Sequence, residues 1–158
     1  MAGVEAPVAV RPLTQADARR IVEVYTQARN TPDLGLLDAI FHPDVVVYDC
    51  GSPEVLRGLE TLKAYYRQSH AGLPDLAFEF GEPVVGGDRM ATRWTLRGTH
   101  RGNLRGLPAT GRTVAVTGQV IDRVVDGKVV EEWVDYDTAG LLRQLGFALV
   151  APAGAPAP

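Results

Sequence analysis

The stretch Thr113-Val-Ala-Val-Thr-Gly-Gln-Val-Ile-Asp-Arg-Val-Val-Asp-Gly-Lys-Val-Val-Glu-Glu-Trp-Val-Asp-Tyr-Asp137 decides the fold of this protein. It contains two segments rich in β-branched and aromatic residues, 113–125 and 128–137, and such segments favour β-strands. The intervening Asp126-Gly127 is typical of a two-residue turn between antiparallel strands. The stretch therefore predicts a long β-hairpin.

Further strands and helices precede this hairpin. Alternation of apolar and polar residues, or a β-branched run, predicts strands at 45–48, 76–80 and 90–98. The periodicity of buried stripes predicts helices at 14–29 and 59–69, the first capped by Thr14 with Asp17, and a short helix starts at Thr31-Pro32-Asp33. Helices followed by long strands indicate an α+β fold, in which a curved antiparallel sheet wraps around the early helices. Such a sheet forms a cone whose mouth can hold a small apolar ligand.

The composition indicates a single globular domain. The chain has 158 residues, of which 46% are hydrophobic and 22% charged. We expect the folded domain to span 13–147, with a loose segment at 1–12 and a mobile Ala/Pro-rich tail at 148–158. No apolar run approaches the roughly 18 residues that a membrane span requires.

Charge and cysteine content narrow the class of partner and the compartment. Sixteen basic and 19 acidic residues give a net charge of −3, without the basic surplus typical of nucleic-acid binders. The N-terminus does not resemble a secretory signal, and Cys50 is the only cysteine. We therefore expect a cytoplasmic protein that binds neither nucleic acid nor membranes.

The sequence contains no motif for a metal or an organic cofactor. His42, His70 and His100 are scattered and do not have metal-ligand spacing. A P-loop, a GxGxxG turn and a GxSxG elbow are also absent. The expected chemistry therefore uses no metal and no motif-bound cofactor.

Three carboxylates fall on apolar strand faces. Asp122 lies between Val120 and Val124 on one face, whereas Glu132 shares its face with Val130, Val134 and Tyr136, and Asp49 shares its face with Val45 and Val47. Burial raises the pKa of a carboxyl group towards neutrality, as a general acid or base requires. The alternatives are that Asp122 pairs with Arg93 or Arg97, that Glu132 is solvated, and that Asp49 is a turn residue.

Other residues also have two interpretations. His100 lies either at the mouth of a pocket or in a loop hydrogen bond, and Trp94 and Tyr65 are typical core residues. Asp137 is expected to cap the last helix. Trp133 falls on the outer face of its strand, which suits a subunit interface.

Several short motifs carry a family resemblance. They are His42-Pro43-Asp44, Gly98-Thr99-His100-Arg101-Gly102, the segments 106–112 and 123–131, Trp133, Asp137, and Gly140-Leu141-Leu142-Arg143-Gln144-Leu145-Gly146. In this order and spacing, over about residues 14–147, the chain resembles the SnoaL-like polyketide cyclase family of the nuclear-transport-factor-2-like superfamily. The resemblance implies a cone-shaped α+β barrel with one deep pocket and no cofactor.

The resemblance also implies a substrate class and a mechanism. Substrates of the best-known branch are aromatic polyketide intermediates of anthracycline type. There an aspartate on the last strand is the general base for an intramolecular aldol ring closure, and a histidine, a glutamine and an asparagine help to hold the enolate. In the register set by the motifs, the aspartate position is Val134 and the asparagine position is Val47. The strand 114–125 contains no histidine.

A valine cannot accept a proton, so the predicted function departs from the cyclase pattern. We expect a polyketide-tailoring hydroxylase in which a deprotonated substrate reacts with oxygen, or with an oxidant from a partner oxidoreductase. Ring closure by a relocated carboxylate is the second hypothesis, and a non-catalytic binding module is the third. The predicted assembly is a homodimer or homotetramer. The predicted catalytic residues are Asp122 and Glu132, and the predicted substrate-binding residues are Val47, Asp49, Trp94, His100, Val120, Val134 and Tyr136.

Overall fold

The structure, a computed structural model, describes residues 11–148 and 150. The other residues of the two predicted loose ends lie outside the described part. The helical elements are α1 (Gln15–Asn30), the 3-10 helix η1 (Leu34–Ala39), α2 (Leu59–Gly72) and α3 (Thr138–Gln144). The strands are β1 (Phe41–Asp49), β2 (Leu56–Arg57), β3 (Ala77–Phe80), β4 (Val84–Gly86), β5 (Arg89–Thr99), β6 (Thr113–Val125) and β7 (Lys128–Tyr136).

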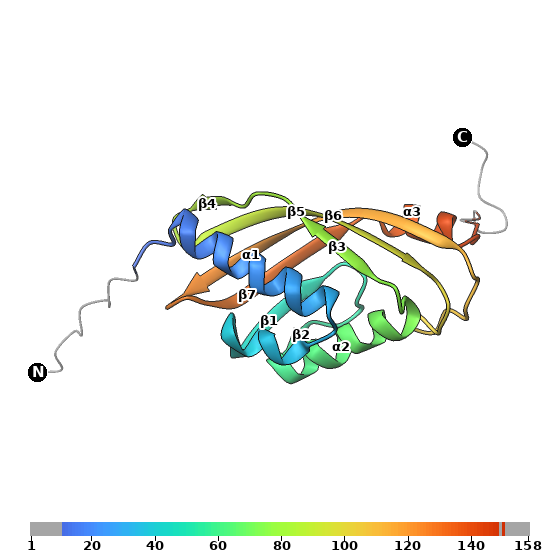
Figure 1. Ribbon diagram of the computed structural model, residues 1–158, viewed down its shortest axis with the longest axis horizontal. Coiled ribbons are helices and arrows are strands. Elements are labelled where there is room, and N and C mark those ends of the chain that lie inside the picture. The colour runs from blue at the N-terminus through green and yellow to red at the C-terminus, as the bar shows by residue number, and fades with distance from the viewer. Residues whose placement is uncertain (1–10, 149, 151–158) are drawn as a thin grey trace, which may run out of the picture.

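The strands form one curved, open sheet in the order β2-β1-β7-β6-β5-β3, with β4 also paired to β5 (Figure 1). The predicted α+β class is confirmed, and β5, β6 and β7 form the expected antiparallel meander. The expectation of a wholly antiparallel sheet is wrong at one pair, because β1 runs parallel to β7. Parallel neighbours need a long connection, and here α2 and five strands separate β1 from β7 in the chain.

The hairpin between β6 and β7 has the predicted turn. Asp126 and Gly127 both have positive φ angles, 49° and 75°, which is the backbone of a type I′ turn. Just beyond the turn, Arg123 pairs with Glu131 but Val124 pairs with Val129, so Val130 is an extra, bulged residue. Strand alternation alone predicted that Val130 shares the inner face with Glu132. Because of the bulge it does not, and the fully buried Val129 takes that place.

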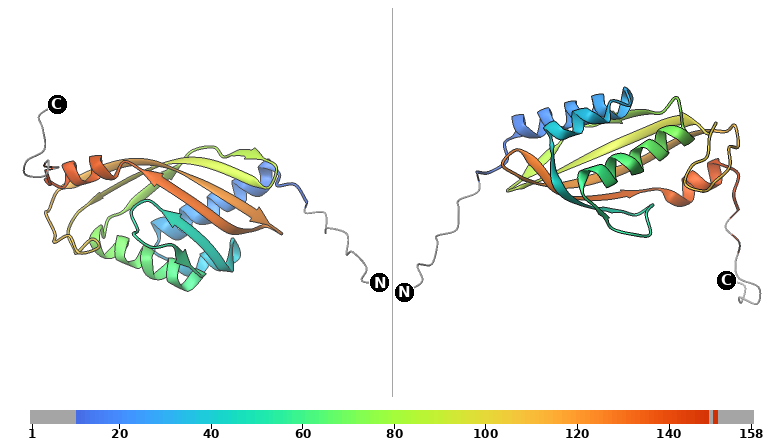
Figure 2. Two further views of the ribbon diagram at one scale, coloured as in Figure 1. Left: turned by 180° about the vertical axis from the view of Figure 1, so that it is seen from behind. Right: turned by 90° about the horizontal axis from the view of Figure 1, so that it is seen from below.

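Helices α1 and α2 lie along the concave side of the sheet (Figures 1 and 2). The predicted capping box starts α1, since the Thr14 hydroxyl accepts a hydrogen bond from the Asp17 amide and the Asp17 carboxylate accepts one from the Thr14 amide. At the other end, the Asn30 side chain makes two hydrogen bonds to the backbone of Phe78, at 2.7 and 2.9 Å. These contacts hold α1 against β3.

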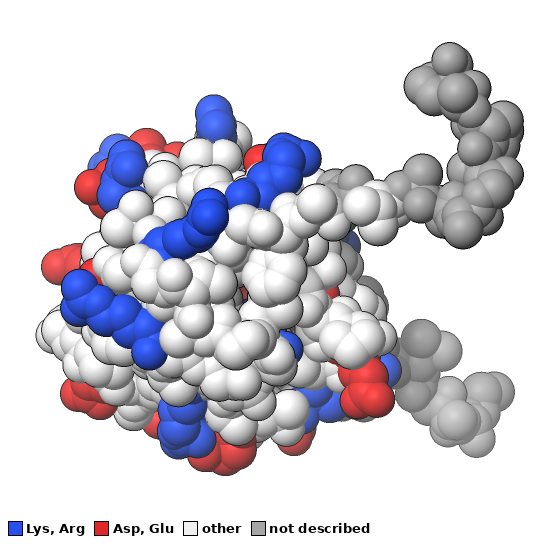
Figure 3. All heavy atoms as spheres, turned by 90° about the vertical axis from the view of Figure 1, so that its right-hand side faces the viewer, with Lys and Arg blue, Asp and Glu red and all other residues white. Residues whose placement is uncertain are grey.

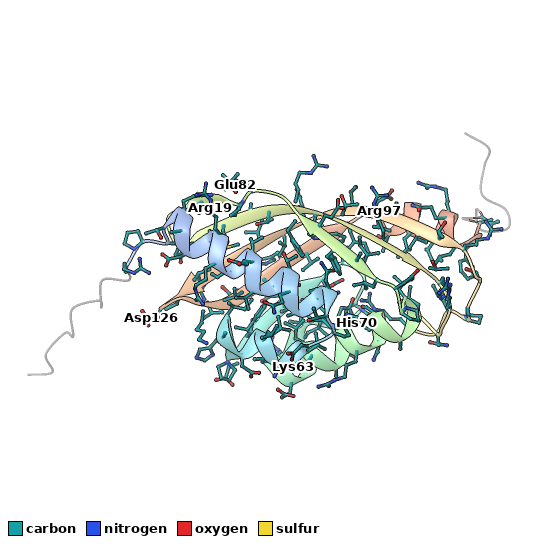
Figure 4. The ribbon with its side chains drawn as sticks, viewed as in Figure 1. Arg19, Lys63, His70, Glu82, Arg97 and Asp126 are labelled. Carbon is teal, nitrogen blue, oxygen red and sulfur yellow. The ribbon has the colours of Figure 1, made fainter. Side chains whose placement is uncertain are left out.

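Two further side chains fix α1 in place, and Figure 4 labels Arg19, Glu82 and His70. Arg19 forms an ion pair with Glu82 at 2.6 Å near the start of the helix. His70 of α2 lies beside the end of α1, where its Nε2 atom is 2.8 Å from the Arg29 carbonyl oxygen. The position of Arg29 along the helix is therefore set by both α2 and β3.

The remaining elements close the ends of the sheet. Asp137 caps α3 as predicted, because its carboxylate accepts a hydrogen bond from the Gly140 amide at 2.7 Å.

On the face shown in Figure 3, basic and acidic side chains both occur, with uncharged areas between them. Within residues 11–148 and 150, no helix is long and apolar enough to cross a membrane.

Candidate active site

A cavity lies between the two long helices and the sheet. It is partly open to solvent, and its walls come from both clusters of the hydrophobic core. The apolar and aromatic part of the wall consists of Leu73, Phe78, Phe80, Trp94, Leu96, Leu104, Val116, Val120, Val134 and Leu141. An apolar cavity with a few polar groups is typical of a site for a small organic ligand.

Polar side chains gather at the more exposed end of the cavity. The Arg105 guanidinium donates hydrogen bonds to the Tyr136 hydroxyl at 3.1 Å and to the Ser69 hydroxyl at 3.2 Å. Its carbon lies 3.8 Å from the centre of the Tyr65 ring. Asp49 lies at the same end, and its carboxylate accepts a hydrogen bond from the Gly51 amide at 2.8 Å. The turn role considered for Asp49 is therefore present, together with its place in the cavity wall.

The two tyrosine hydroxyls at this end are neutral donors. Burial raises the pKa of Tyr65 and of Tyr136, and the nearby Asp49 carboxylate raises both further. The Tyr65 hydroxyl is buried and has no hydrogen-bond partner among the described residues. Neutral hydroxyls and a guanidinium in a partly dry cavity can stabilise a negatively charged oxygen of a ligand.

Two glycines allow aromatic side chains to reach the cavity. A Cβ on Gly51 would overlap the Tyr136 hydroxyl, and a Cβ on Gly118 would overlap the Trp94 indole. Neither glycine has a left-handed backbone, so the requirement is for space and not for conformation. The positions of Tyr136 and Trp94 thus depend on missing side chains in neighbouring segments.

The inner end of the cavity contains a buried cation. Arg29 is 4% exposed, and its guanidinium carbon lies 3.6 Å from the centre of the Tyr66 ring and 4.5 Å from that of Phe78. Tyr25 lies next to it, and its hydroxyl is 2.5 Å from the Tyr66 hydroxyl. Arg29, Tyr25 and Tyr66 all line the cavity.

Asp122 and Glu132 form a buried carboxyl pair behind this wall. They are direct register partners on β6 and β7, and they are 5% and 1% exposed. Both line a second, much smaller cavity, which shares the side chains of Tyr25, Phe80 and Val120 with the main one. The Tyr66 hydroxyl donates a hydrogen bond to Glu132 Oε1 at 3.3 Å, so one side chain connects the pair with the main cavity.

Burial determines the protonation of this pair. It raises the pKa of Asp122 to about 7 and raises the pKa of Glu132 well above its usual range, and the charge of Asp122 raises the latter further. At neutral pH the pair therefore retains at least one proton and can both give and take protons. A pKa near the working pH is optimal for general acid/base catalysis.

The predicted site residues fall into three groups. Asp49, Trp94, Val120, Val134 and Tyr136 line the main cavity. Asp122 and Glu132 are buried as predicted, but they border the smaller cavity, and no ion pair joins Asp122 to Arg93 or Arg97.

Val47 and His100 are not brought to either cavity. Val47 packs into the core at 1% exposure. His100 is fully buried in the loop after β5, where its Nδ1 atom is 3.1 Å from the Thr110 hydroxyl, which matches the loop interpretation.

The sequence interpretation missed four polar residues of the cavity, namely Tyr25, Arg29, Tyr66 and Arg105, and took Tyr65 for plain core. Arg29 follows Tyr25 by four residues on the buried stripe of α1, which is the only signal that a charged residue faces inwards. Arg105 lies in a loop without periodicity, so no local pattern indicates its position. Among the described residues, no group of three or more His, Cys, Asp or Glu side chains has the arrangement of a metal site.

Comparisons with known proteins agree with this architecture. The family model described as SnoaL-like polyketide cyclase matches residues 19–145. The aklanonic acid methyl ester cyclase DauD of Streptomyces sp. strain C5 is 32% identical over 142 residues, which are 86% of this chain and 83% of DauD.

Two solved structures are also similar. TsrD of Streptomyces laurentii has a TM-score of 0.77 at 33% identity and covers 85% of this chain and 98% of its own. AclR of Streptomyces galilaeus, a candidate hydroxylase, has a TM-score of 0.73 at 28% identity and covers 89% of this chain and 87% of its own.

Proposed function

Because this chain belongs to the SnoaL-like polyketide cyclase family, we propose that it closes a ring in an aromatic polyketide intermediate of anthracycline type. The observation that carries this proposal is the buried pair of Asp122 and Glu132, which Tyr66 connects to an aromatic-lined cavity. The name of DauD, an aklanonic acid methyl ester cyclase, supports the class of substrate and the reaction.

The reaction needs only proton transfers. A C–H group next to a substrate carbonyl loses its proton to the Tyr66 hydroxyl while Tyr66 passes its own proton to the carboxyl pair. The two protons move together, because burial raises the pKa of Tyr66 well above its usual value and disfavours a free tyrosinate. The enolate carbon then attacks a second carbonyl of the same molecule, and the resulting alkoxide regains the proton. The pair thus replaces the family's aspartate, whose position is Val134.

The exposed end of the cavity stabilises the charge that develops. Arg105, Tyr65 and Tyr136 present N–H and O–H groups to a substrate oxygen that becomes negative as the enolate forms. One preorganised donor of this kind is commonly worth about 3 kcal/mol of barrier. The hydroxyls and the carboxyl pair therefore act on different parts of one substrate.

Hydroxylation is the second candidate function. Val134 lines the cavity at the position of the family's base, and AclR, a candidate hydroxylase, is 28% identical to this chain. In this case the same deprotonated carbon adds dioxygen to form a hydroperoxide, which a partner oxidoreductase reduces to the alcohol with two electrons, or it takes an oxygen atom from an oxidant that the partner supplies. The cavity and the proton path serve both reactions, so the product distinguishes them.

The test is incubation of the protein with aklanonic acid methyl ester and with aklanonic acid, with and without air, followed by mass spectrometry. Ring closure gives a product of unchanged mass under both conditions. A product that gains oxygen only in air supports hydroxylation. Binding without any product contradicts ring closure and direct reaction with dioxygen and supports a binding module.

We also propose that the chain forms a homodimer or a homotetramer in the cytoplasm. Tyr48, Trp133 and Ile121 are neighbours across β1, β7 and β6 on the outer face of the sheet. The Tyr48 and Trp133 rings stack at 5.7 Å, and Tyr48 and Ile121 are each 39% exposed. A second copy would cover this apolar patch.

A further inference from the structure

Arg29 is a buried cation without an anionic partner. Arg29 is 4% exposed, and within residues 11–148 and 150 its guanidinium makes no ion pair or hydrogen bond. Its Nε atom in particular is buried and unsatisfied. Burying a charge without a partner costs roughly several kcal/mol, so the position of Arg29 requires an explanation.

The nearest carboxyl groups do not neutralise it. Glu132 lies close enough to feel the charge of Arg29, but it forms no ion pair with Arg29, and it accepts its hydrogen bond from Tyr66. Burial raises the pKa of both groups, that of Asp122 to about 7, so both carboxyls favour their neutral form. The hydrogen bond between His70 and Arg29 involves the Arg29 backbone carbonyl, so His70 fixes the helix and does not bond to the guanidinium.

The geometry of Arg29 selects the kind of anion. Its guanidinium packs against the rings of Tyr66 and Phe78, contacts that use the face of the group and not its N–H bonds. The N–H groups lie in the guanidinium plane, and Nε with one Nη presents a fork that matches the two oxygens of a carboxylate. Because Arg29 lines the main cavity, a ligand bound there lies next to the guanidinium.

We propose that Arg29 binds a carboxylate of the ligand, so that the cavity prefers a planar aromatic acid to the corresponding ester. The aromatic wall formed by Phe78, Phe80 and Trp94 contacts the ring system, and the carboxylate occupies the inner end of the cavity. This inference rests on the proposed function for the aromatic part of the ligand. It differs from the compound in the name of DauD, which is a methyl ester.

The experiment measures equilibrium binding of anthraquinone-2-carboxylate and of its methyl ester by titration calorimetry near neutral pH. We expect the wild-type protein to bind the carboxylate at least about tenfold more tightly, as expected for a charge-assisted bidentate contact. Arg29→Met should remove this preference, and Arg29→Lys, which keeps the charge but loses the fork, should retain only part of it. Arg19→Met on the exposed side of the same helix is the matched control and should bind both probes like the wild type.

Two outcomes would overturn the inference: a wild-type protein that binds the ester as tightly as the acid, or an Arg29→Met variant that keeps the preference. Thermal unfolding of each variant verifies that it is folded, and the wild-type comparison decides the question if Arg29→Met does not fold. Neither probe can undergo ring closure. Failure of this inference is therefore distinct from failure of the proposed reaction.

Discussion

Asp122 and Glu132 stand opposite each other on β6 and β7, and both point into the protein interior, where a single hydrogen bond from Tyr66 connects them to the ligand cavity. Two acids side by side in an apolar environment cannot both be ionised at low cost. This relationship determines how both stability and activity should depend on pH.

The first prediction is that the carboxyl pair makes the protein less stable at higher pH. The pKa of an aspartate in the unfolded chain is about 4, whereas burial raises the pKa of Asp122 in the folded protein to about 7. Between these values the folded state binds more protons than the unfolded state, so the free energy of unfolding falls as pH rises, by about 1.4 kcal/mol per pH unit for one proton. Asp122→Asn removes the contribution of Asp122 to this dependence, while that of Glu132 remains, and the variant should therefore be more stable than the wild type at about pH 8.

Urea unfolding at several pH values measures this effect. Asp135→Asn, an exposed carboxylate on the same strand as Glu132, is the control and should keep the slope of the wild type. An Asp122→Asn variant with the same pH slope as the wild type would show that burial does not perturb Asp122.

The second prediction concerns the proton path. Asp122→Asn and Glu132→Gln should each lower kcat by about 10²–10⁴-fold without loss of folding, as expected for removal of a general acid or base. Tyr66→Phe breaks the contact between the cavity and Glu132, and it should lower kcat in the same direction. Steady-state turnover of the aromatic polyketide measures all three effects, with Asp135→Asn as the unaffected control.

Asp49 provides the discriminating variant for this path. It lies directly in the cavity wall, so it is the alternative proton acceptor. Normal turnover in both pair variants together with a large loss in Asp49→Asn would assign the role of base to Asp49 instead.

The third prediction uses the space left by Gly51. In Gly51→Ala, the new methyl group overlaps the Tyr136 hydroxyl, so Tyr136 must move and its hydrogen bond with Arg105 is disturbed. We expect a loss of activity of about tenfold or more, as for a weakened oxyanion contact. Thermal stability should change little, because the whole Tyr136 side chain can swing away from the new methyl group. Gly86→Ala is the matched control, since a Cβ there meets no atom within 4 Å. Equal activity in the two variants would mean that Tyr136 has no role in the reaction.

The fourth prediction concerns assembly through the outer face of the sheet. Ile121→Glu puts a charge next to Trp133 in the patch formed with Tyr48, so it should shift the protein from dimer to monomer in sedimentation experiments. Val150→Glu changes a residue that is 84% exposed beyond the end of α3 and is not part of this patch, so it should not affect assembly. A wild-type protein that sediments as a monomer at micromolar concentration would contradict the proposal.

Local sequence determined the elements and part of the site. The Thr14 capping box, the Asp126-Gly127 turn and the Asp137 cap depend on residues within a few positions of each other, and each forms as predicted. The burial of Asp122 and Glu132 was also predictable, because strand alternation puts them among valines. Alternation failed at Val130, since a bulge at that residue shifts the parity of β7, and nothing in the adjacent sequence indicates a bulge.

Tertiary structure alone decided which polar groups meet at the cavity and how the strands are ordered. Arg29 contacts Tyr66 and Phe78, and Arg105 contacts Tyr136, across segments tens of residues apart in the chain. The parallel pairing of β1 with β7 likewise joins distant segments. Periodicity records only whether a residue faces inwards or outwards, because it arises from the geometry of a single helix or strand. Which inward-facing side chains share a cavity depends on the packing of separate elements, and this is why the sequence predicted buried acids but not the buried arginine beside them.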